Sequence, residues 1–167
     1  LDVTTNLTLF DQETFDKFLT FKKVTFVVSI DGYGDTYDYI RYKGDWKTLE
    51  KNLNIIGATE IDNFQWRVSC VLQLYNVFNI RDLSLFLFKK QYKNFSHFVV
   101  DVYIKPYEKS ELNVKNMPDN LLEQVYMPTS KPKKYIAGLI GKEKNINMLK
   151  EFARKTVIYD KLRNQSY

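Results

Sequence analysis

Short runs of β-branched and aromatic residues alternate along the chain with longer segments that have apolar residues on one helical face. The run Val24–Ile30 contains mostly β-branched and aromatic residues, which predicts a strand buried on both faces, as in a parallel sheet. Similar runs predict strands over 1–6, Gln65–Leu74 and His97–Ile104. The first half of the chain therefore supplies about four strands.

Helical spacing separates these strands. Three segments have apolar residues three and four positions apart, and each follows a residue that can cap a helix. The predicted helices are 12–19, 46–56 and 80–90, after the caps Asp11, Asp45 and Asn79. Strands joined by helices of this length form βαβ units with right-handed crossovers. The fold class is therefore α/β with a parallel sheet, whose ligands bind at the carboxyl ends of the strands.

The alternation stops after Pro106. A short helical stretch is expected at Asp119–Val125, a polar connector at Lys131–Lys134, and a long amphipathic helix from Glu143 to about Arg163. The expected organisation is thus a core over 1–106, followed by an α-helical extension over 107–167.

The composition excludes several classes of protein. The hydrophobic fraction of 44% suits one folded domain of 167 residues. With one cysteine and one histidine, the chain alone cannot form a disulfide framework, a cysteine-based cluster or zinc site, or a metal site with two histidines. Cys70 lies within a predicted strand and is expected to be a packed core thiol. No apolar run approaches 18 residues and no signal sequence opens the chain, so we expect no membrane partner and a cytoplasmic location.

Positive charge is concentrated at the carboxyl end. Residues 131–167 contain ten Lys and Arg and three acidic residues, a net +7, whereas the rest of the chain carries −2. Such a tail can bind nucleic acid. Interspersed acidic residues and helical spacing favour the solvated face of a surface helix instead.

The segment Ser29–Trp46 contains the most distinctive group of polar residues. Ser29 and Asp31 end a predicted strand, Gly32 follows, and Arg41 precedes the next helix. The stretch Asp31–Gly44, rich in Gly, Asp and Tyr, is expected to be a loop. Serine and aspartate can bind hydroxyl or amino groups, and arginine offers a fork of donors to a carboxylate or phosphate. A ligand with amino, carboxylate and ribose groups would use all three side chains. A turn beside a surface arginine would also explain the pattern.

This segment resembles radical S-adenosylmethionine (SAM) enzymes. The SxDG at the end of a buried strand looks like their fourth strand, and YIRYKGDW (39–46) is similar to members with a twitch extension. Thr4-Thr5-Asn6 resembles their TTNG motif, with Leu7 where glycine is usual. The segment 73–79 resembles their fifth strand and its Asn-containing exit. Met117–Leu122 and Asp160–Arg163 resemble parts of the twitch region.

The resemblance implies a partial parallel (β/α) barrel, a partial TIM barrel, of which this chain is the second half. It implies that Ser29, Asp31 and Arg41 bind SAM, and that Thr5, Asn6 and Asn76 lie on the substrate side. In the intact protein, an iron-sulfur [4Fe-4S] cluster would cleave SAM reductively to a 5′-deoxyadenosyl radical.

The chain lacks the CxxxCxxC motif that holds the cluster. A [4Fe-4S] cofactor is expected only if a cluster-binding segment precedes this chain, and the isolated chain is expected to be inactive. Because the first residue is Leu within a predicted strand, we expect a fragment whose open sheet edge is covered by the missing amino-terminal half or another partner. The alternatives are a non-catalytic ligand- or protein-binding module and a nucleic-acid-binding protein that acts through its basic carboxyl-terminal helix.

Overall fold

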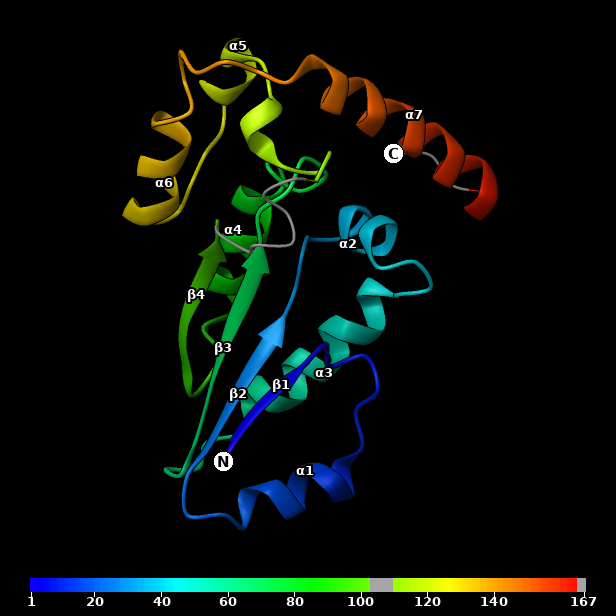
Figure 1. Ribbon diagram of the computed structural model, residues 1–167. Helices are drawn as coiled ribbons and strands as arrows, with labels where there is room; N and C mark the ends of the chain where they lie inside the picture. Colours follow the sequence, from blue (N-terminus) through cyan, green and yellow to red (C-terminus); the bar gives the residue numbers. More distant parts are fainter. Residues whose placement is uncertain (103–109, 165–167) are drawn as a thin grey trace.

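Four parallel strands form one open sheet, in the order in which they occur in the chain (Figure 1). The computed structural model describes residues 1–102 and 110–164. The strands are β1 (Asp2–Thr5), β2 (Val24–Ser29), β3 (Phe64–Val71) and β4 (Phe95–Asp101). Each neighbouring pair is parallel; Ser29 pairs with Ser69, and Val71 with Asp101. The predicted α/β class with four parallel strands is therefore confirmed. Part of the strand expected up to Ile104 lies outside the described residues.

Three helices connect the strands. They are α1 (Gln12–Leu19), α3 (Trp46–Ala58) and α4 (Ile80–Lys90). Strands in sequential order, joined by crossovers of the usual right hand, have their connecting helices on one face of the sheet. Residues from this face, including Phe26 and Trp66, form one apolar cluster with Phe15 of α1, Leu53 of α3 and Leu83 of α4.

The strand β2 is buried on one face only. Val24, Phe26 and Val28 are at most 4% exposed, whereas Thr25, Val27 and Ser29 are half-buried. The prediction that this strand is buried on both faces is therefore wrong, because the connecting helices all cover the same side. The strand β3 shows the same alternation, and its half-buried positions include Arg67 and Ser69.

Two of the three predicted helix caps are confirmed. Asp11 accepts a hydrogen bond from the backbone N–H of Thr14, and Asp45 accepts one from that of Thr48, both at 2.8 Å. Asn79 does not cap α4 with its side chain. Its Oδ1 instead accepts a hydrogen bond from the backbone N–H of Tyr33 at 2.6 Å, which fastens the loop after β2 to α4.

The remaining α-helices lie towards the carboxyl ends of the strands (Figure 1). They are α2 (Asp35–Ile40), α5 (Asp119–Leu122), α6 (Ser130–Ala137) and α7 (Ile146–Arg163). The long predicted helix is confirmed as α7, which begins after the cap Asn145. Among the described residues, no helix has the length and apolar character needed to cross a membrane.

Two predictions about local structure are wrong. Lys131–Lys134 belongs to helix α6 and is not a connector, because Pro132 and Ile136 are buried one turn apart on the same helix face. The stretch expected to be a loop over Asp31–Gly44 contains α2, in which Tyr37 and Tyr39 are buried. In both segments tertiary burial stabilises a helix that the local sequence did not predict.

Candidate ligand site at the carboxyl edge of the sheet

A cavity of about 320 Å³ lies where the ends of β2 and β3 meet α2 and α7. Asp31 and Arg41 contribute to its lining from the segment after β2, and Gln73 and Tyr75 from the segment after β3. Arg163, at the end of α7, also lines it. The cavity occupies the edge where parallel α/β sheets bind their ligands.

Asp31 holds Arg41 in position. One carboxylate oxygen of Asp31 accepts a hydrogen bond from an Nη of Arg41 at 2.5 Å, and the other accepts one from the backbone N–H of Val71 at 3.1 Å. The Asp31 side chain is 10% exposed and that of Arg41 36%. Among the described residues, the buried Nε of Arg41 has no hydrogen-bond partner. The arginine is thus oriented by Asp31, and its partly exposed guanidinium has further N–H donors that could meet an anionic ligand.

The turn around Arg41 depends on its neighbours. The backbone N–H of Gly44 donates a hydrogen bond to the carbonyl oxygen of Arg41, and a Cβ on Gly44 would lie 2.6 Å from that oxygen. Only glycine allows this close approach. The carboxylate of Asp38 accepts a hydrogen bond from the backbone N–H of Trp46 at 2.6 Å, and burial raises the pKa of Asp38. These contacts join the end of α2 to the start of α3.

Ser29 lies close to this pair along the chain, but outside the lining of the cavity. It is half-buried on the face of β2 opposite the connecting helices, beside Ser69 of β3. Ser69 donates a hydrogen bond to Asp101 at 2.7 Å. The Asp101 carboxylate therefore lies beside Ser69, on the face of the sheet opposite the connecting helices.

Thr5 and Asn6 are not brought to the cavity. The Thr5 hydroxyl accepts a hydrogen bond from the backbone N–H of Leu7 at 2.9 Å, and Asn6 accepts bonds from Thr8. Leu7 has a φ of 56° and is 3% exposed. The position where the motif usually has glycine therefore adopts a left-handed conformation, which glycine favours.

Asn76 fastens the strand ends together. It is fully buried; its Nδ2 donates to the carbonyl oxygens of Asp31 at 2.9 Å and of Val71 at 2.7 Å. Its Oδ1 accepts a hydrogen bond from the backbone N–H of Gln73 at 2.9 Å. Asn76 thus links the backbone after β2 to the end of β3. Its role on the substrate side stays a prediction.

The group of tyrosines after β2 divides between two roles. Tyr33 and Tyr37 pack edge-on against Trp46, with ring centroids 4.9 and 5.7 Å from it. Tyr39 lines the cavity, and its hydroxyl donates to Asp160 at 2.7 Å. Burial, with a contribution from this hydrogen bond, raises the pKa of Tyr39. Sequence reasoning did not select Tyr39 individually.

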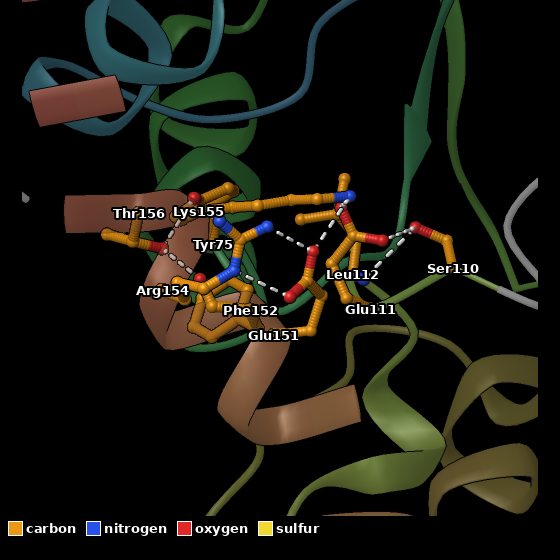
Figure 2. Close-up of polar contacts among 9 residues, drawn as sticks. All are labelled: Tyr75, Ser110, Glu111, Leu112, Glu151, Phe152, Arg154, Lys155 and Thr156. Carbon is orange, nitrogen blue, oxygen red and sulfur yellow. Dashed lines mark hydrogen bonds and ion pairs between the residues drawn. The ribbon is translucent and has the colours of Figure 1, made fainter. Parts of the chain in front are cut away.

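Helix α7 is fastened over the edge of the sheet by a polar network, which Figure 2 shows. Lys155 pairs with Glu111 at 2.8 Å and approaches Glu151 within 3.6 Å. Its hydrogen bond lowers the pKa of Glu111. Thr156 and Tyr75 share a hydrogen bond of 2.7 Å, so the same helix also contacts a residue that lines the cavity.

Cys70 is a core residue, as predicted. Its side chain is fully buried, and this burial raises its pKa well above that of an ordinary thiol. It is therefore a protonated thiol at neutral pH and unsuited to binding iron. Within residues 1–102 and 110–164, no three His, Cys, Asp or Glu side chains are grouped as metal ligands.

The chain matches no protein-family model, no curated protein and no solved structure.

Proposed function

We propose that this chain is the SAM-binding second half of a radical SAM protein. The observation that carries the proposal is the guanidinium of Arg41, which Asp31 holds beside a cavity at the carboxyl edge of β2. The proposal follows the resemblance of residues 29–46 to the radical SAM family. It also agrees with the general position of ligands in parallel α/β folds.

The sheet supports the barrel part of this proposal. Its strands follow one another in chain order, and its connecting helices lie on one face, as in each part of a (β/α) barrel. The opposite face carries half-buried polar residues, including Ser29, Arg67 and Ser69. In a closed barrel this face would line the interior. We propose that another segment or chain completes the barrel along the edge of β1.

The residues present fit SAM in part. Arg41 offers a fork of donors to the carboxylate of the methionine moiety, with Asp31 as the residue that orients it. The Ser29 hydroxyl would serve a polar group of the ligand from the interior face. When bound and reductively cleaved, SAM supplies a 5′-deoxyadenosyl radical.

The described residues do not fit a [4Fe-4S] cluster. Such a cluster is held by cysteine thiolates, and Cys70 is a fully buried thiol. We therefore derive no step through a cluster from this chain. Its ligands would have to come from the segment or partner that completes the barrel.

The charge distribution favours a small ligand over nucleic acid. Part of the basic tail is used within the chain, where Lys144 pairs with Asp119, Arg154 with Glu151 and Lys155 with Glu111. A cavity with an oriented arginine indicates a small ligand more specifically than the unpaired basic residues of the tail indicate nucleic acid. Binding to nucleic acid would appear as a steep loss of affinity with added salt.

Calorimetric titration of the chain with SAM tests the proposal. We expect SAM to bind, and Arg41→Ala to weaken binding about 10-fold or more, because a hydrogen bond to a charged group is lost. Arg81→Ala is the matched control, since Arg81 is exposed on α4. A second ligand, 5′-methylthioadenosine, lacks the amino acid portion of SAM. It should bind to Arg41→Ala and to Arg81→Ala with the affinity of the wild type. Failure of SAM to bind, or equal binding by Arg41→Ala, would refute the proposal.

A further inference from the structure

Arg163 is the second arginine that lines the cavity, and it comes from the extension. One of its Nη atoms donates to the carbonyl oxygen of Tyr39 at 3.1 Å. Its guanidinium carbon lies 5.0 Å from the ring centroid of Tyr42 and 5.2 Å from that of Tyr159. Two cation–π contacts and a hydrogen bond thus fix the side chain in one orientation.

No carboxylate pairs with Arg163 in the part of the chain that the structure describes. The acidic residue nearest to it on α7, Asp160, accepts the hydroxyl of Tyr39 instead. A guanidinium has five N–H donors, and the contact with Tyr39 occupies one nitrogen. Arg163 is therefore an oriented cation with donors to spare, beside a cavity.

The cavity as a whole has an excess of positive charge. Among its described lining residues are two arginines and one acidic residue, Asp31, which Arg41 already neutralises. The aromatic rings of Tyr39 and Tyr75 lie 5.1 Å apart in the same lining. This lining suits a ligand that combines an acidic group with a flat apolar part.

We infer that Arg163 binds an anionic group, a carboxylate or a phosphate, of the substrate that shares this cavity with SAM. The inference rests on the proposed function, which assigns Arg41 to the carboxylate of SAM and so leaves Arg163 for a second ligand. It names the substrate class as acidic and makes α7 part of the binding site. Arg163 is then a specificity-determining residue.

The test is a titration of the chain with inorganic phosphate and, separately, with succinate, at constant ionic strength, followed by NMR. We expect Arg163→Gln to weaken binding of the preferred anion about 10-fold or more. Arg163→Lys keeps the charge but loses the planar fork, so its affinity should be intermediate. Lys161→Gln removes the same charge from an exposed position two residues away and should change nothing. Tighter binding of phosphate would indicate a phosphorylated substrate, and tighter binding of succinate would indicate a carboxylic acid.

Hydrogen exchange across α7 shows whether each variant keeps the helix in place. If Arg163→Gln loosens the helix, Arg163→Lys with normal protection must still bind the anion more weakly than the wild type. The inference is overturned if neither anion binds to the wild type. It is also overturned if an Arg163 variant that keeps α7 in place binds the anion as tightly as the wild type.

Titration of the same variants with SAM separates the two proposals. SAM should bind normally to Arg163→Gln and weakly to Arg41→Ala. If SAM does not bind but anion binding depends on Arg163, the proposed function fails and the anion site remains. If SAM binds through Arg41 and no anion depends on Arg163, only the inference fails.

Discussion

Asp31 and Arg41 lie ten residues apart in the chain and form an ion pair of 2.5 Å at the carboxyl end of β2. The second oxygen of Asp31 is bonded to the backbone of Val71 after β3, so the pair is anchored to two neighbouring strands. This anchoring turns a loop arginine into a preorganised group. It also makes Asp31 a residue of both the site and the fold.

We predict that Asp31→Asn destabilises the chain by about 1–2 kcal/mol, because it removes a charged hydrogen bond from a partly buried position. Denaturant unfolding measures the change. Asp62→Asn, at an exposed turn, should alter the free energy of unfolding by less than about 0.5 kcal/mol. Equal stability of the two variants would show that the ion pair contributes nothing to the fold.

Gly57→Ala should destabilise the chain by about 1–3 kcal/mol through overpacking. A Cβ at Gly57 would lie 2.1 Å from the ring of Tyr92. In a double-mutant cycle measured by denaturant unfolding, Tyr92→Ala should remove most of the penalty. A cost that persists in the double variant would place the strain in the backbone of α3.

The Leu7→Gly substitution has two opposing effects on the free energy of unfolding. Relief of the left-handed conformation at φ 56° is worth about 1–2 kcal/mol, whereas loss of a buried leucine costs about 2–5 kcal/mol. We expect net destabilisation, measured by denaturant unfolding. Leu9→Gly, whose side chain is 96% exposed, should cost at most about 1 kcal/mol. A stabilised Leu7→Gly variant would mean that strain outweighs burial at this turn.

The attachment of α7 should weaken in acid. The folded pKa of Glu111 is lowered by its hydrogen bond from Lys155, so its stabilisation is present above the ordinary pKa of glutamate. It is lost as pH falls from about 5 through the folded pKa. Hydrogen exchange of α7 between about pH 3 and 7 measures this loss. Glu111→Gln should remove most of this loss of protection at low pH. Glu60→Gln, in an exposed pair with Lys93, should leave the pH dependence of protection unchanged.

The edge strand β1 is expected to mediate self-association. It pairs only with β2 in the described sheet, which leaves its other edge open. Light scattering of the wild type should show dimers or larger species at high concentration. Thr4→Lys, at an exposed position on β1, should shift the distribution towards monomer, because edge lysines oppose strand pairing. A monodisperse wild-type monomer would contradict the prediction.

The local sequence was sufficient to predict the strands and the helices that connect them. Periodicity and capping act within a few residues, which is why Asp11 and Asp45 marked the starts of α1 and α3. The candidate ligand-binding residues between Ser29 and Arg41 could also be selected from the sequence, because these polar residues follow an apolar strand. Helix α6 was not, since its stability depends on the burial of Pro132 and Ile136.

By itself, the sequence determined the α/β class, the order of the core elements and the polar segment at the end of β2. Only the tertiary structure decided which residues share the cavity. The hydroxyl of Tyr39 meets Asp160 across 121 positions, and its carbonyl oxygen meets Arg163 across 124. Contacts over such separations arise when α7 folds back onto the edge of the sheet, and they leave no periodic signal in the chain. Tertiary packing also decided the place of Asn76, whose fully buried amide bonds to the carbonyl oxygen of Asp31, because a buried polar group must find its partners within the fold.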